Sequence, residues 1–131
     1  MKKLQIGMSK LIGSFLVAGL TVLSLSAFGQ SKEKTMTVKG EVLDMSCYMA
    51  EGAHGAGHKM CAQMCLKKGL PAGLLTSDGK VYLLVEDHDK TDAYNTVIKH
   101  AADQMTITGK YADKNGVQAL VVENAKASSG S

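Results

Sequence analysis

Residues 72–89 read AGLLTSDGKVYLLVEDHD, and this stretch decides the fold class. Asp78-Gly79 separates two apolar runs, and an Asp-Gly pair in that setting is a strong signal for a β-hairpin. The reason is that the tight turn needs positive φ at its central residues, which Asp and Gly tolerate. The pattern predicts paired strands at 74–76 and 81–85, so we expect a protein built mainly on β-structure.

Two further segments extend this sheet. Residues 35–45 read TMTVKGEVLDM, in which apolar and polar residues alternate with the period of two that is typical of a half-buried strand. Residues 104–125 read QMTITGKYADKNGVQALVVENA. Here Asn115-Gly116 predicts a second hairpin turn, with strands at 105–111 and 117–122.

Between the hairpins, residues 91–102 read TDAYNTVIKHAA and have the apolar spacing of a helix of about three turns. Thr91 or Asp92 is its expected N-cap. The predicted order is strand, insertion, strand, strand, helix, strand, strand. This order predicts a five-stranded OB-fold-like Greek-key barrel, with one helix between strands 3 and 4 and a helical Cys/His insertion (46–72) between strands 1 and 2.

The N-terminus has the features of a secretory signal peptide over residues 1–29. A basic start is followed by a Leu/Val/Ala-rich run and by small residues at Ala27 and Gly29, which favours cleavage after Gly29. The alternative is an uncleaved membrane anchor, because the apolar run is near the length that spans a bilayer. We expect a periplasmic or secreted protein with no stable membrane anchor after cleavage, a domain over 30–126 and a disordered tail over 127–131.

The charge balance argues against a nucleic-acid partner. Lys2, Lys3 and Lys10 leave with the expected signal, so 12 basic residues face 12 acidic ones in the mature chain. A basic patch is the usual electrostatic footprint of nucleic-acid binding, and none is predicted. The chain also has no Trp and only 5% aromatic residues, so a base-stacking surface is poorly supported.

The chemistry-bearing groups gather in the insertion, where residues 47–71 read CYMAEGAHGAGHKMCAQMCLKKGLP. We expect Cys47 at or just past the end of the first strand, and a short helix over 58–68 that ends at Gly69. On that helix, Cys61 and Cys65 lie one turn apart and His58 lies three residues earlier, so all three share a face. Together with Cys47 they form the ligand set of a Cys3His metal site.

The ligand types suit one Zn(II) or one Cu(I) per chain. His54, in the glycine-rich loop, is a further candidate that would replace His58 or add a donor. Met60 and Met64 lie on a different stripe of the helix from the cysteines, and we expect this stripe to pack against the barrel. The metal ion is thus the main expected partner, with an exported protein as a second.

Two other functions fit the cysteines. A disulfide from Cys47 to Cys61 or Cys65 would staple the insertion onto the barrel, which would then serve as an interaction or ligand-binding module. A thiol-disulfide redox protein is less favoured, because the helical spacing is C-x-x-x-C rather than C-x-x-C. The sequence contains no recognisable catalytic triad, phosphate loop or haem motif, so it predicts no enzyme.

The segments TVKGEVLD, DGKVYLLVE and MTITGKYADKNGVQALVVENA, with the pattern C-Y…H-x-x-C-A-x-x-C…G-x-P-x-G, resemble small exported bacterial OB-fold proteins that carry a Cys/His-containing insertion. The resemblance implies the barrel fold and export. The chain lacks the basic, aromatic face of the nucleic-acid-binding OB-fold proteins. It also differs from exported copper-carrying OB-fold proteins, whose ligands lie on barrel strands.

Overall fold

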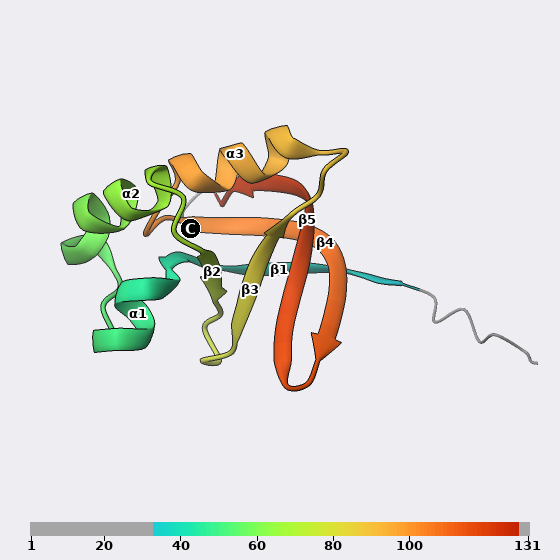
Figure 1. Cartoon of the computed structure of the whole chain (residues 1–131), viewed down its shortest axis with the longest axis horizontal. Coiled ribbons are helices and arrows are strands. Elements are labelled where there is room, and N and C mark those ends of the chain that lie inside the picture. The colour runs from blue at the N-terminus through green and yellow to red at the C-terminus, as the bar shows by residue number, and fades with distance from the viewer. Residues whose placement is uncertain (1–32, 129–131) are drawn as a thin grey trace, which may run out of the picture. The chain divides into compact units, whose positions relative to one another are not determined.

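The computed structural model of the chain describes residues 33–128; the expected signal peptide and residues 129–131 of the expected tail lie outside this range. The described part is mainly β, as predicted, and its five strands close into a barrel (Figure 1). Around the barrel the strands follow the order β1-β2-β3-β5-β4. Their bounds are β1 (Lys34–Asp44), β2 (Ala72–Leu75), β3 (Val81–Glu86), β4 (Gln104–Lys114) and β5 (Val117–Ala127).

Strand β1 closes the barrel because it pairs with two neighbours along its length. Its residues 34–41 pair antiparallel with β4, and its residues 41–44 pair antiparallel with β2. The exchange of partners occurs beside Gly40, where a Cβ atom would lie 2.4 Å from the main-chain oxygen of Leu75. Only a glycine fits this close approach of two strands, so Gly40 permits the bend that brings the end of β1 to the insertion.

The two hairpins form at the predicted turns. Thr76 accepts from the Lys80 N–H across the Asp78-Gly79 turn, between β2 and β3. At the second turn both Asn115 and Gly116 have positive φ, as an Asn-Gly hairpin requires. Strand β5 then pairs antiparallel with β4 and parallel with β3, which completes the barrel.

Three α-helices accompany the strands (Figure 1). Helices α1 (Met45–Glu51) and α2 (Lys59–Lys67), joined through a 3₁₀ turn at Ala56–His58, lie between β1 and β2 in the chain, and α3 (Thr91–Lys99) follows β3. The N-cap residue of α3 is Lys90, and not Thr91 or Asp92 as expected. The Lys90 side chain makes no capping hydrogen bond. Within residues 33–128, no helix is both long and apolar enough to cross a bilayer.

The barrel interior and two of the helices share one core. Alternate residues of β1 and β4 point inward, among them Val42, Met105 and Ile107, and Val97 of α3 packs with them. Helix α2 contributes Ala62 and Leu66 to the same cluster, whereas α1 has no buried residue. Helix α2 is therefore fixed by hydrophobic packing, and α1 is not.

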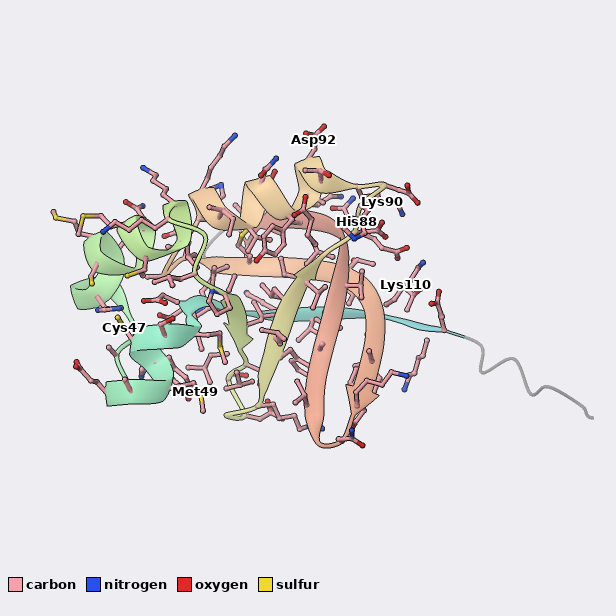
Figure 2. All side chains as sticks on the ribbon, viewed as in Figure 1. Cys47, Met49, His88, Lys90, Asp92 and Lys110 are labelled. Carbon is pink, nitrogen blue, oxygen red and sulfur yellow. The ribbon has the colours of Figure 1, made fainter. Side chains whose placement is uncertain are left out.

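The expected packing of Met60 and Met64 against the barrel is wrong. Their exposed fractions are 78% and 53%, because the stripe of α2 that contacts the core is the one with Ala62 and Leu66. Met49 of α1 is also exposed (Figure 2). The helices that carry the cysteines therefore also carry three exposed thioethers.

Replacement of Gly40 by Ala should destabilise the barrel by about 1–3 kcal/mol, because the added methyl group meets main-chain atoms of β2 that cannot move aside. Urea unfolding followed by circular dichroism measures this loss. Gly57→Ala is the matched control, since a Cβ atom at Gly57 meets nothing within 4 Å. Equal stability of the two variants would contradict the role assigned to Gly40.

Candidate metal centre

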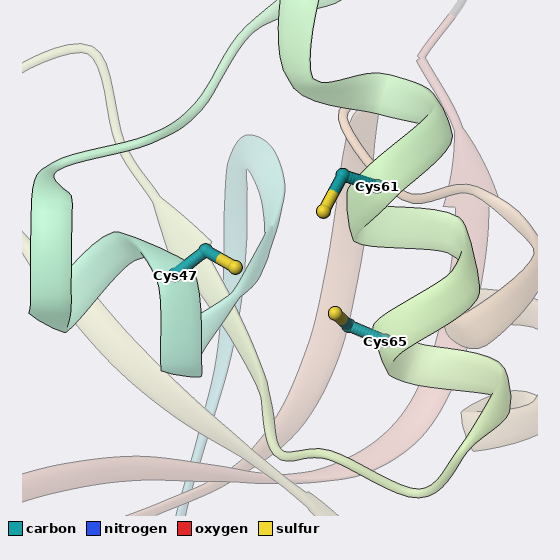
Figure 3. A group of neighbouring side chains, drawn as sticks. All are labelled: Cys47, Cys61 and Cys65. Carbon is teal, nitrogen blue, oxygen red and sulfur yellow. The ribbon is translucent and has the colours of Figure 1, made fainter.

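Three thiols converge between α1 and α2. The Sγ atoms of Cys47, Cys61 and Cys65 all lie within 4.8 Å of one another, and Figure 3 shows them pointing toward a common space. Cys61 and Cys65 come from successive turns of α2, whereas Cys47 comes from α1. All three cysteines of the chain fall within the described residues, each is half-buried, and none forms a disulfide. The thiols are close enough to hold one metal ion.

Cys47 lies just past the end of β1, as predicted, and it belongs to α1, a helix that the sequence did not indicate. The chain turns into α1 because the buried side chain of Asp44, the last residue of β1, accepts a hydrogen bond from the Ser46 N–H at 3.0 Å. The helix ends at Gly52, whose left-handed conformation, φ 68°, allows its N–H to donate to the Tyr48 carbonyl. These two local signals place Cys47 in the first turn of α1.

The two ends of the insertion are tied together. The Met45 N–H donates to the Pro71 carbonyl at 2.9 Å, so the start of α1 lies beside the segment that follows α2. Helix α2 ends at Lys67, one residue before the predicted end, and Lys68 is its C-cap. Gly69 follows in the left-handed conformation, φ 88°, and its N–H donates to the Leu66 carbonyl. This closure holds α1 next to α2 and so brings the Cys47 thiol to the pair on α2.

A second group of possible ligands adjoins the first. One ligand atom from each of Asp44, Cys47 and His58 lies within 4.8 Å of the other two, so Cys47 belongs to both groups. The His58 Nε2 atom lies 3.9 Å from Asp44 Oδ2. Within residues 33–128, these two atoms are the buried side-chain nitrogen and oxygen atoms that lack a hydrogen-bond partner. Buried polar atoms without a partner are costly, which marks this space as a ligand position.

The two histidines that the sequence singled out lie in different places. His58 ends the 3₁₀ turn before α2 and faces Asp44 and Cys47, although it is not within the group of three thiols. His54 lies apart from both groups: its Nδ1 is 3.3 Å from Glu41 Oε2, and its ring stacks edge-on against Tyr48. Glu41 also accepts from the Gly55 N–H, so the glycine-rich loop is anchored to β1.

Asp44 is a site residue that the sequence analysis missed. Its side chain is fully buried, and it follows a strand and precedes Cys47 by three residues. The signal in the sequence was an acidic residue at the end of a predicted strand, three residues before a cysteine. Such a pattern can predict that Asp44 caps the following helix. It cannot predict that the second carboxylate oxygen of Asp44 lies beside His58, because that position depends on the fold of the whole insertion.

The charge of Asp44 dominates the electrostatics of the thiols. Burial raises the pKa of the Asp44 carboxyl, but the Cys47 thiol, the Ser46 N–H and the Cys65 thiol lower it by more, so the net pKa lies below its usual value. Neither thiol makes a hydrogen bond of normal geometry to Oδ2, which remains without a partner. Asp44 is therefore a carboxylate at neutral pH.

The pKa values of the Cys47 and Cys65 thiols shift in the opposite direction, upward. The adjacent Asp44 carboxylate, which favours the protonated thiol, raises the pKa of Cys47 to about 12, with further contributions from burial. Burial first, and then Asp44, raises the pKa of Cys65. In the metal-free protein these thiols are thus protonated near neutral pH, and a bound cation would have to displace their protons.

No protein-family model, no curated protein and no solved structure matches the chain. The site offers three thiols, one imidazole and one carboxylate, which together form a donor set for a soft or borderline metal ion. The imidazole and the carboxylate each have one buried atom without a hydrogen-bond partner.

Asp44→Asn should make the Cys47 thiol of the metal-free protein react faster with iodoacetamide at pH 8. The substitution removes the negative charge that opposes the thiolate, so the pKa of Cys47 falls from about 12 toward its ordinary value of 9.0. Each unit by which the pKa falls raises the thiolate fraction roughly tenfold, so we expect a gain of about tenfold or more. Peptide mass mapping in chelator measures the rate at Cys47.

The side-chain oxygen of Asn can still accept a hydrogen bond at the N-cap of α1, so we expect the helix to remain folded in this variant. A change in rate would then come from the loss of charge. Asp92→Asn, at an exposed position of α3, is the control and should leave the rate unchanged. An unchanged rate in Asp44→Asn would show that Asp44 does not control this thiol.

Proposed function

We propose that the chain is an exported metal-binding protein that holds Zn(II) or Cu(I) through Cys47, Cys61 and Cys65, with His58 beside them. The observation that carries this proposal is the convergence of three free thiols within 4.8 Å from two separate helices. Soft thiolates with one imidazole suit both ions. Two facts favour metal over a staple: the thiols are unpaired, and the His58 Nε2 beside them has no partner.

The barrel is best interpreted as OB-fold-like. Five strands in the order β1-β2-β3-β5-β4, with β3 parallel to β5, support a Greek-key arrangement of this kind. We further infer that two elements are added to the five strands of this barrel: the helix between β3 and β4, and the Cys/His insertion between β1 and β2. The insertion would then be the functional part, and the barrel its rigid support.

A carrier role is favoured over a purely structural one. The core cluster consists of barrel residues, Ala62 and Leu66 of α2, Val97 of α3 and Ala101 just after α3, and none of the possible metal ligands belongs to it. The three cysteines are half-buried, so an ion held by them stays within reach of a partner. A structural metal site, by contrast, is normally closed and needed for folding.

The full chain should bind Zn(II) or Cu(I) stoichiometrically, and Cys47→Ser should abolish this binding, because Cys47 belongs to both ligand groups. Native mass spectrometry of reduced protein measures the bound ion, with a thiol count in denaturant and chelator on the same sample. Affinity should fall as the pH is lowered, because protons compete for the thiolates.

His54→Gln is the control for this test and should bind like the parent, since His54 lies apart from both groups. Two results would contradict the proposal. One is a metal-free protein with a single free thiol that takes up no added ion after reduction, which points to a stapled interaction module. The other is normal binding by Cys47→Ser.

Export rests on residues 1–29 alone, which have the pattern of a cleaved signal. The chain produced in a Gram-negative host should appear in the periplasmic extract with its N-terminus at Gln30, as measured by intact mass. A chain without residues 2–29 is the control and should stay in the cytoplasm. Recovery of the intact, uncleaved chain in the membrane fraction would support an anchor instead.

A further inference from the structure

We propose that the insertion holds two borderline divalent cations, of the Zn(II) class, at adjacent positions that share the Cys47 thiolate. Position one consists of Cys47, Cys61 and Cys65. Position two consists of Asp44, Cys47 and His58. The proposal rests on the metal-binding function proposed above and extends it to a second ion and a further ligand, Asp44.

The geometry separates the donors into two overlapping sets. Within each set the ligand atoms lie within 4.8 Å of one another, and Cys47 is the member common to both. A thiolate sulfur has more than one lone pair, so it can bond two ions at once. Cys47 therefore has the place of a bridging ligand, between a thiol side formed by α2 and a mixed side formed by Asp44 and His58.

One ion in position one leaves the neighbouring atoms unsatisfied. The buried Oδ2 of Asp44 and Nε2 of His58 would still lack hydrogen-bond partners, and at 3.9 Å they are too far apart to hydrogen-bond to each other. A cation in position two satisfies both atoms together. The Asp44 side chain is fully buried, so it has no contact with bulk solvent.

The charges also favour two ions. When metal binds, three thiolates and the Asp44 carboxylate bring four negative charges to the site, while His58 as a ligand is neutral. A single divalent cation leaves two of these charges uncompensated beside a buried carboxylate, which is costly. Two divalent cations neutralise the set, so the second ion removes the repulsion between Asp44 and the bridging thiolate.

The donor types select the class of ion. Sulfur, imidazole nitrogen and carboxylate oxygen together suit Zn(II) and its spectroscopic substitutes Co(II) and Cd(II), whereas Cu(I) prefers the all-sulfur position. Each position has three protein donors. A tetrahedral ion therefore keeps one coordination site for water or for a ligand of a partner.

Titration of the reduced full chain with Cd(II), followed by native mass spectrometry, tests the second position. The parent should saturate at two ions. Asp44→Asn and His58→Gln should each saturate at one, and so should Cys61→Ser combined with Cys65→Ser, because each change leaves the other position intact. His54→Gln is the matched control and should keep two ions.

Circular dichroism of each variant shows whether it is folded, and Asn at position 44 retains the cap of α1. Cadmium NMR of the two-ion form should give two resonances coupled to each other through the shared sulfur. Saturation of the parent at one ion, with no ion in the double cysteine variant, would overturn the second position but leave the proposed function standing. A parent that binds no Cd(II), Zn(II) or Cu(I) would overturn both.

Discussion

The buried carboxylate of Asp44 is the constraint on which the insertion depends. It lies at the end of β1, paired in the sheet with Ala72 at the start of β2, and its Oδ1 caps α1. Its second oxygen faces His58 and the Cys47 thiol without a hydrogen bond. A charge this deeply placed needs a positive partner, because protein interiors solvate an ion poorly. The arrangement of α1, the 3₁₀ turn and α2 around it is the one expected of a cation site.

The barrel was predictable because its signals are local. The alternation in β1 and β4 and the Asp-Gly and Asn-Gly turns depend only on neighbouring residues, and the structure confirms a mainly β, five-stranded barrel. The convergence of Cys61 and Cys65 follows from one helical turn. Cys47 joins them because antiparallel pairing of β1 with β2 returns the chain to the same end of the barrel.

The rest depended on contacts between distant residues. Helix α1 has no fully buried residue, so no apolar periodicity indicated it in the sequence. Its caps at Asp44 and Gly52 and the hydrogen bond from the Met45 N–H to the Pro71 carbonyl hold it in place. Met60 and Met64 were misplaced because an apolar stripe indicates burial only where another element covers it, and α2 meets the core through Ala62 and Leu66. The partner of His54 is Glu41, thirteen residues away on β1, and no local pattern identifies such a pair.

The two helices that carry the thiols are anchored unequally. Cys61 and Cys65 belong to a helix that is packed into the core, whereas Cys47 belongs to one that has no buried residue. Segments with little buried apolar surface open locally at lower free energy than the core. We therefore expect the Cys47 side of the thiol group to open more readily than the α2 side. If the group holds an ion, Cys47 would be the ligand that an incoming thiol replaces first, and the barrel would stay folded.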